Sequence, residues 1–420
     1  MRKEDSRSGI GVAIDLGTTT IVGASVVIEG ATVFGTVAGL NPQVRFGRDV
    51  LARINAARDG GVLRELCKDA VDACNGIIGG LAVSTEDIRE ITVAGNPAME
   101  HLFLGISPEP LSRVPYRPAF KEARRLLAGE AGLHAGKDAG LYVFPLIGGF
   151  VGGDSVAVVL ALEMLKKKGA VLAVDIGTNS EIILAADGVL YATSAAAGPA
   201  FEGGEISCGM MAQRGAIQGV GIDNDSVILD VIGGSSARGI CGSGLIDAVS
   251  GLIGSGIIEP SGRIRNRAEV DTNLADRIKE AEGGNSFVLY AGPSGAVEIT
   301  QTDIRALQAA KSAIRAGIEI LLRKAGIAAG DIDAVYIAGA FGSKIKKQGL
   351  EAIGITDGSW REKITFVGDA ALLGAALALN EDGKAEAEDI AGSVKYVSLS
   401  GSAHFEREFI KNMDFSSKTG

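Results

Sequence analysis

Two acidic residues occur in nearly the same short pattern, once near the start of the chain and once near its middle. Residues 12–18 read VAIDLGT and residues 172–178 read LAVDIGT, so Asp15 and Asp175 each stand between an apolar run and a Gly-Thr turn. A second apolar run follows each turn, which predicts two β-hairpins with an acid near the tip. Turns of this kind present backbone N–H groups to phosphate oxygens, and hydroxyls add further donors.

Acids beside phosphate-binding turns imply a metal ion. Asp15 and Asp175 would repel phosphate unless a hard cation lay between them, and Mg²⁺ takes one or two carboxylates together with phosphate oxygens and water. A single copy could be an ordinary hairpin turn, but the repetition favours two related halves that bind a polyphosphate and Mg²⁺, with Asp15 and Asp175 binding the metal through water. The predicted phosphate-binding residues are Gly17, Thr18, Thr19, Thr20, Gly177, Thr178 and Asn179.

A third motif, residues 335–343, reads VYIAGAFGS. It predicts a buried strand entering a glycine turn, which an adenine ring or a ribose can approach closely because glycine has no Cβ. The three motifs, in this order, resemble the actin, sugar-kinase and heat-shock-chaperone ATPase superfamily. The resemblance implies an α/β fold of two RNase H-like lobes (the actin-like ATPase fold) around a nucleotide cleft that binds ATP and Mg²⁺. It places the adenosine at Gly339, Ala340, Phe341 and Gly342.

Helical segments accompany these motifs. The apolar spacing predicts helices over 49–81 and 303–325, and connecting helices over 153–168 and 369–379. The resemblance implies that Gln308 and Lys311, on the helix predicted over 303–325, contact adenine. The alternative is that these two side chains lie on a solvated face of that helix. The resemblance also makes Asp154 the candidate that orients or deprotonates the attacking water. The alternative role for Asp154 is a helix N-cap.

Further motifs narrow the family. Residues 39–43, 46–50, 95–99, 148–154, 203–210 and 239–247 read GLNPQ, FGRDV, GNPAM, GGFVGGD, GGEISCGM and GICGSGLID. With the hairpins they resemble the ATPase domain of reductive activators of corrinoid proteins, over residues 11 to 409. The resemblance implies an ATPase that drives reduction of cobalt(II) to cobalt(I) in a corrinoid (cobalamin) protein of a methyltransferase system. It leaves a homodimer open. Four cysteines without framework spacing indicate a cytoplasmic protein.

Family members carry an iron–sulfur module, usually a ferredoxin-like domain before the ATPase domain. The ten residues before Gly11 contain no cysteine. The resemblance therefore implies a ferredoxin-like electron donor outside this chain. The four cysteines, Cys67, Cys74, Cys208 and Cys241, lack ferredoxin spacing, so we expect no iron–sulfur cluster in this chain.

Three alternatives remain open. Cys208 and Cys241 faintly resemble the cysteine motifs of activators of 2-hydroxyacyl-CoA dehydratases, which hold a cluster at a dimer interface, although there the first cysteine precedes the second hairpin. A small-molecule kinase of the same superfamily would need a polar substrate site. A nucleotide-switched filament or chaperone would need polymerisation surfaces or a peptide-binding domain.

Composition limits the other classes of function. The net charge of −10 argues against a nucleic-acid partner, and no apolar stretch is long enough to span a bilayer. Charged residues make up 22% and apolar residues 46% of 420 residues, which is typical of a globular protein with more than one domain. We predict a disordered N-terminus (1–10), lobe one with the first hairpin (11–168), lobe two with the second hairpin and adenosine motif (169–400), and a C-terminal tail (401–420).

Overall fold

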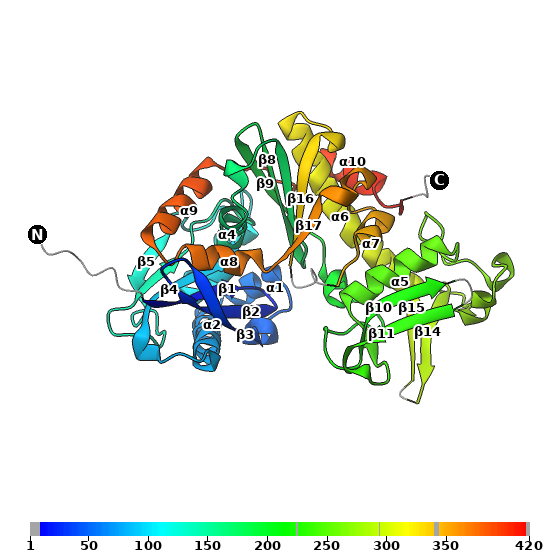
Figure 1. Cartoon of the computed structure of the whole chain (residues 1–420), viewed down its shortest axis with the longest axis horizontal. Coiled ribbons are helices and arrows are strands. Elements are labelled where there is room, and N and C mark those ends of the chain that lie inside the picture. The colour runs from blue at the N-terminus through cyan, green and yellow to red at the C-terminus, as the bar shows by residue number, and fades with distance from the viewer. Residues whose placement is uncertain (1–8, 224–225, 294, 340–343, 417–420) are drawn as a thin grey trace, which may run out of the picture. The chain divides into compact units, whose positions relative to one another are not determined.

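The computed structural model describes residues 9–416 except 224–225, 294 and 340–343. It is an α/β protein whose residues group into two compact units (Figure 1). Both units are discontinuous in sequence. Unit 1 comprises the residues up to Lys168, Gly188–Ala192 and Asp369–Tyr396; unit 2 comprises Gly169–Asp187, Thr193–Gly368 and the residues from Val397.

Unit 1 is built on a six-stranded sheet in the order β3-β2-β1-β4-β6-β5. Its strands are β1 (Ile10–Leu16), β2 (Thr20–Val27), β3 (Thr32–Leu40), β4 (Ile88–Gly95), β5 (Arg124–Leu127) and β6 (Gly140–Val143). Strands β1 and β2 are antiparallel, with Asp15 opposite Val22, and β1 is parallel to β4. The first predicted hairpin is therefore confirmed.

The two faces of this sheet are covered by different helices. Val12, Ile14 and Leu16 of β1 belong to one core with α1 (Val50–Ala56), α2 (Gly60–Gly80) and α3 (Pro97–Phe103). On the opposite face, the Thr92 hydroxyl of β4 donates to the carbonyl oxygen of Ala375 at 2.7 Å. That face carries α4 (Gly153–Ala161), α8 (Ala370–Leu377) and α9 (Glu381–Ser393), as Figure 1 shows.

Two of the predicted helices differ in extent. The pattern over 49–81 forms two helices because Asp49 and Asp59 each cap a new start: Asp49 accepts from Ala52 N, and Asp59 accepts from Gly61 N. The first connecting helix ends at Ala161, earlier than expected, and a short 3₁₀ turn follows with Glu163 at φ +49°.

Unit 2 repeats the same plan. Its central sheet has the order β17-β16-β7-β8-β9, and β18 pairs with Tyr191 and Ala192 of β9, residues that cluster with unit 1. The strands are β7 (Ala170–Asp175), β8 (Asn179–Ala186), β9 (Val189–Ala196), β16 (Ile332–Ala338), β17 (Ile364–Gly368) and β18 (Lys395–Tyr396). Read from β9, the strands β9-β8-β7-β16-β17 take the places of β3-β2-β1-β4-β6 in unit 1, where the edge strand β5 precedes β6 in the sequence. The repeated hairpin thus reflects two halves of one topology.

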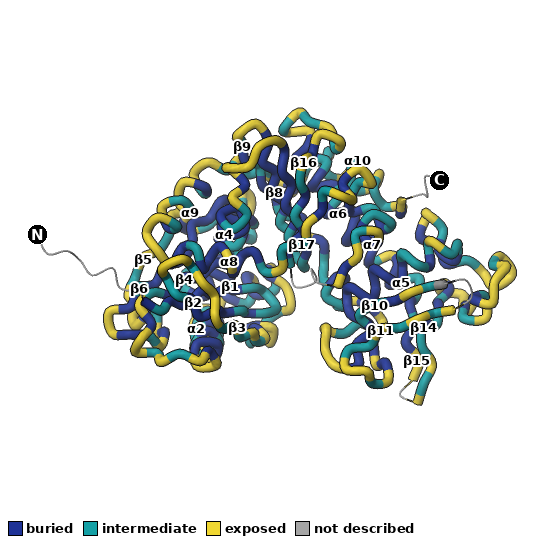
Figure 2. The backbone as a smooth tube through the Cα atoms, viewed as in Figure 1, coloured by how far each residue is buried: buried dark blue, intermediate teal, exposed yellow. Residues whose placement is uncertain are grey.

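The long helix α6 (Gln301–Ala325) packs on this sheet. Thr300 and Asp303 form a capping box at its start. Gly317 permits close contact with β8, because a Cβ there would lie 2.4 Å from the Cδ1 atom of Ile182. Helix α10 (Ala403–Lys411) in turn packs on α6. In Figure 2 the strand β8 is largely buried, whereas α10 contains no buried residue.

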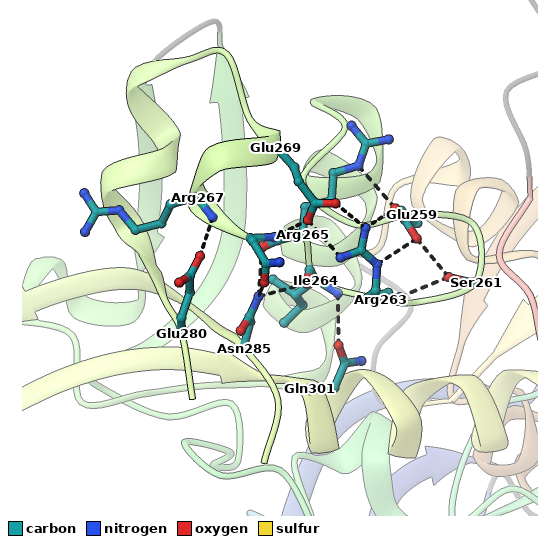
Figure 3. A network of polar contacts seen from close by, with 11 residues as sticks. Glu259, Ser261, Arg263, Ile264, Arg265, Arg267, Glu269, Glu280, Asn285 and Gln301 are labelled. Carbon is teal, nitrogen blue, oxygen red and sulfur yellow. Dashed lines mark hydrogen bonds and ion pairs between the residues drawn. The ribbon is translucent and has the colours of Figure 1, made fainter. Parts of the chain in front are cut away.

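Unit 2 also contains two three-stranded sheets that the sequence did not predict. They comprise β10 (Ala216–Asp223), β11 (Ser226–Val231) and β12 (Gly239–Ile240), and β13 (Ile278–Lys279), β14 (Ser286–Gly292) and β15 (Gly295–Thr300); α5 (Gly242–Gly254) packs on β10, and α7 (Lys347–Ile353) packs on α5. A polar network ties the loop before β13 together (Figure 3). In it, Arg263 bridges Glu259 and Glu269 at 2.5 and 2.9 Å, and Asn285 Nδ2 donates to the carbonyl oxygen of Ile264 at 3.1 Å.

Candidate functional site

Hydrogen bonds from two side chains hold the turn of the first hairpin in place. Gly17 has no room for a side chain, because a Cβ there would lie 2.4 Å from the carbonyl oxygen of Thr20. Asn41 Nδ2 donates to the carbonyl oxygen of Gly17 at 2.9 Å, and Arg53 Nη2 donates to that of Thr18 at 2.6 Å. These carbonyl oxygens are therefore bonded to internal donors.

Arg53 is a charged residue that is fully buried. Its guanidinium also donates to the carbonyl oxygen of Gly47 at 2.9 Å and to the side-chain oxygen of Gln43 at 3.3 Å. Burial lowers the pKa of Arg53 to about 10, so the group keeps its proton at neutral pH. It places a positive charge under the turn. Sequence reasoning missed Arg53, because an arginine in a helical pattern is usually exposed.

The Thr18 hydroxyl is oriented by the start of α3. Asn96 caps this helix by accepting from Met99 N at 3.1 Å, and its Nδ2 donates to Thr18 Oγ1 at 2.9 Å. Since Thr18 Oγ1 accepts this bond, its own proton is available for another acceptor. Thr19 and Thr20 complete the turn: the Thr19 carbonyl oxygen accepts from Asn41 N at 2.9 Å, and Thr20 lies in the β2–β3 ladder.

Asp154 lies in the first turn of α4 and is half-buried. It is not the N-cap, which is Gly152. Ser155 N donates to Asp154 Oδ1 at 2.6 Å. Burial raises the pKa of Asp154 to about 6, although hydrogen bonds from the backbone of Gly152, Asp154 and Ser155 act to lower it. This value is suited to a general base at neutral pH.

The turn of the second hairpin already holds an anion. Oε1 of Glu202, at the end of a 3₁₀ turn (Pro199–Glu202), accepts from Thr178 N at 2.9 Å and from Thr178 Oγ1 at 2.7 Å. Gly177 N donates to Ser180 Oγ at 3.3 Å, and Asn179 begins β8. The N–H and the hydroxyl of Thr178 thus converge on one carboxylate oxygen, an arrangement that charge-assisted hydrogen bonds favour.

The third motif reaches the second hairpin within unit 2. Strand β16 pairs with β7, so that Ala338 lies opposite Asp175, and Ile176 N donates to the carbonyl oxygen of Ala338 at 3.3 Å. Gly339 follows with φ +105°. A Cβ at Gly339 would lie 2.7 Å from the carbonyl oxygen of Ile176 and 3.0 Å from Asp175 Oδ1, so glycine is required here. The predicted adenosine contacts Ala340, Phe341 and Gly342 lie outside the described residues.

Gln308 and Lys311 are buried in α6, each only 1% exposed, and are not on a solvated face. Lys311 Nζ donates to the carbonyl oxygens of Asn412 and Asp414, and Gln308 Nε2 donates to that of Met413 at 2.9 Å. Burial lowers the pKa of Lys311 to about 8. Both side chains therefore bind the segment after α10; the adenine contact stays a prediction.

The two predicted magnesium ligands, Asp15 and Asp175, lie in different units. Among the described residues no group of three or more His, Cys, Asp or Glu side chains is arranged to hold a metal. Asp175 is the last residue of β7 and Asp15 is the last but one of β1, and both are partly exposed. Mg²⁺ keeps most of its water ligands and takes few carboxylates, so the magnesium contact of each acid stays a prediction.

Cys67, Cys74, Cys208 and Cys241 are free thiols. The Sγ atom of Cys241 lies 3.4 Å from the carbonyl oxygen of Ile217, its hydrogen-bond acceptor.

In the part of the chain that the structure describes, no helix is long and apolar enough to cross a membrane.

Two family models match consecutive parts of the chain. The RACo middle region matches residues 10–167, and the model described as the C-terminal domain of RACo, the ASKHA domain, matches residues 169–419. The second match alone covers more than half of the chain. ASKHA domains have the actin-like ATPase fold, so the fold expected from the three motifs is confirmed.

Individual proteins agree with these matches. The chain is 33% identical to the corrinoid activation enzyme RamQ of Eubacterium limosum, over 88% of this chain and 64% of the relative. It is 27% identical to the [Co(II) methylated amine-specific corrinoid protein] reductase of Methanosarcina barkeri, over 68% of this chain and 54% of the relative. The solved structure of a reductive activator for corrinoid, iron–sulfur protein superimposes with a TM-score of 0.87 at 36% identity, covering 98% of this chain and 67% of that one. The chain thus spans less than two thirds of the length of either curated relative.

Proposed function

The chain belongs to the RACo family, and we propose that it is the ATP-binding and ATP-hydrolysing part of a reductive activator that acts on a corrinoid protein. The names of its relatives support the choice of a corrinoid protein as partner, since one activates a corrinoid protein and another reduces one that contains Co(II). The observation that carries the ATP half of the proposal is the anion already bound at the second turn, the Glu202 carboxylate on Thr178.

The two turns bind the phosphates of ATP in this proposal. Thr18 offers a hydroxyl proton that Asn96 leaves free, above the buried charge of Arg53. Thr178 offers an N–H and a hydroxyl once Glu202 has moved aside. Asp15 and Asp175 would hold Mg²⁺ through water, and the ion would supply positive charge that offsets the charge of the phosphates. Gly339 lets the nucleoside approach the backbone next to the second turn.

Asp154 activates the attacking water. With a pKa of about 6 it is mainly ionised at neutral pH and can accept a proton as water attacks the terminal phosphorus. The bond from that phosphorus to the bridging oxygen breaks, ADP leaves, and inorganic phosphate carries the oxygen of water.

Electron transfer in this proposal involves one electron. A reduced iron–sulfur cluster of a ferredoxin-like donor loses an electron, and Co(II) of the corrinoid protein gains it and becomes Co(I). The ATPase contributes no electron: ATP-bound and ADP-bound states with different affinities for the corrinoid protein shift the equilibrium of this transfer.

Linkage between nucleotide and partner tests the proposal. If ATP changes the affinity of the chain for a Co(II) corrinoid protein, the corrinoid protein must change the affinity for ATP by the same factor. We expect calorimetry with a non-hydrolysable ATP analogue to give a different dissociation constant when the Co(II) protein is present, and the Asp175→Ala variant to lose the difference.

Two results would contradict the proposal. One is an ATP-analogue affinity that stays the same with every corrinoid protein tested. The other is a metabolite that yields ADP and its own phosphate ester in equal amounts, which would make the chain a small-molecule kinase.

A further inference from the structure

The segment Gly95–Glu100 has no role in the proposed function apart from the contact of Asn96 with Thr18. It comprises the end of β4 and the first turn of α3. Helix α3 continues this segment with side chains that lie fully inside unit 1, among them Met99, whose Sδ accepts from Arg53 Nη1 at 3.3 Å. A buried helix beside a phosphate-binding turn invites the question of what its polar groups do.

Glu100 is the unusual member of this helix. Its side chain is fully buried, and Oε1 accepts from the backbone N–H of Gly95 at 3.2 Å. Among the described residues Oε2 has no hydrogen-bond partner. Burying an ionised carboxylate without a cation costs far more than burying the neutral acid, so the structure favours Glu100 with its proton.

The carboxyl of Glu100 touches two backbones. A Cβ at Gly153 would lie only 2.3 Å from Glu100 Oε1, so the carboxyl occupies the space that a side chain would need at the first residue of α4. A Cβ at Gly152 would lie 2.4 Å from the carbonyl oxygen of Gly95. The glycines therefore let the end of β4 and the start of α4 meet at Glu100.

Asp154 is the next residue of α4. The backbone of Gly153 also bonds the carboxyl of Glu100, and the Asp154 charge, after burial, keeps the pKa of Glu100 well above its usual range. A second ionised carboxylate at this place would repel that of Asp154.

We propose that Glu100 is a positioning residue for Asp154, joining the first turn of α4 to the end of β4 as a buried neutral carboxylic acid. The proposal rests on the proposed function, since that function gives Asp154 its role. It also gives α3 a purpose: Asn96 at its N-cap orients Thr18, and Glu100 one turn later orients Asp154. Helix α3 thereby positions both the phosphate-binding turn and the general base within unit 1.

The test begins with the proton, in a measurement independent of ATP turnover. Infrared difference spectra of the purified chain should show the C=O stretch of a protonated carboxylic acid at neutral pH. Glu100→Gln should lose this band and keep the fold. The matched control Glu86→Gln, at an exposed carboxyl, should keep the band. A wild-type spectrum without the band would overturn the proposal, even if the chain proved not to be an ATPase.

Kinetics then test the positioning. Glu100→Gln preserves shape and neutrality, so its kcat should stay within about 3-fold of wild type with the same acid limb of the pH profile. Glu100→Ala should lower kcat by about 10-fold or more with a smaller change in KM, and should move the acid limb. Wild-type kcat and pH profile in Glu100→Ala would overturn the proposal. So would an equal loss in a folded Glu100→Gln. If Glu100→Ala does not fold, the Glu100→Gln kinetics and the infrared band decide.

Discussion

One oxygen of Glu202 accepts both hydrogen bonds that Thr178 offers at the turn of the second hairpin, from its N–H at 2.9 Å and from its hydroxyl at 2.7 Å. The carboxylate therefore stands where the proposed function puts a phosphate oxygen. A nucleotide that uses these donors must first displace Glu202.

Removing Glu202 should therefore tighten nucleotide binding. Hydrogen bonds to a charged group contribute about 1.5–3 kcal/mol, part of which the displaced carboxylate recovers in water. We expect Glu202→Ala to bind ADP up to about 10-fold more tightly in titration calorimetry. The matched control Thr178→Val, which removes the hydroxyl, should bind ADP more weakly. Weaker ADP binding by Glu202→Ala would mean that Glu202 supports the nucleotide site.

The two acids at the hairpins should each be necessary for ATP turnover. If Asp15 and Asp175 hold a hydrated Mg²⁺, then Asp15→Ala or Asp175→Ala should lower kcat by about 100-fold or more, because metal charge stabilises the transition state by several kcal/mol. Circular dichroism should show an unchanged fold. Asp72→Ala, at an exposed ion pair with Lys68, is the control and should keep full activity. Near-normal turnover in either hairpin variant would refute the magnesium site.

The pH dependence of ATP turnover should follow Asp154. A base must be ionised, so kcat should fall as the pH drops through about 6, and Asp154→Asn should lower turnover to the background rate.

The contribution of Asp154 to the stability of the fold should change with pH in the opposite direction. A raised carboxyl pKa stabilises the fold fully below the unfolded value of 3.8, and this contribution is lost as the pH rises through about 6. Between pH 4 and pH 7 the melting temperature of Asp154→Asn should therefore fall by less than that of the wild type. A steeper loss in the variant would contradict this assignment.

Lys311 should anchor the segment that follows α10. Lys311→Met removes the Nζ donor to the carbonyl oxygens of Asn412 and Asp414, and leaves Ser312 Oγ as a remaining donor to that of Asn412, at 2.7 Å. Hydrogen–deuterium exchange should be faster over 403–416 in this variant, and unchanged in Lys324→Met at the exposed end of α6. Measuring ATP affinity in the same variants also tests the predicted adenine contact: an affinity equal to wild type in Lys311→Met would exclude it.

The parts of the site that the sequence predicted are those with local signals. Both hairpins and strand β16 follow from short apolar runs that lead into a glycine turn, a pattern contained within a few residues. The same reasoning was weaker where glycine-dense segments carry no period, so the small sheets β10–β12 and β13–β15 were not predicted.

The missing part of the site depends on contacts between distant segments. Arg53 reaches Thr18, Glu202 reaches Thr178, and Glu100 meets the start of α4 only after folding. A weak signal existed for Glu202 and Glu100, since each directly adjoins a motif that the family resemblance rests on. For Arg53 no local signal existed, because its burial depends on the packing of α1 against the turn.

The burial of Arg53 also bears on how the first turn responds to salt. Mobile ions screen exposed charges strongly at physiological ionic strength, but they approach a fully buried guanidinium much less closely. Its hydrogen bonds go to carbonyl and amide oxygens and to a thioether rather than to a carboxylate, and Asp49 is an acid that acts on it through its charge. The attraction of the turn for a polyanion should therefore persist at salt concentrations that screen the attraction exerted by exposed lysines.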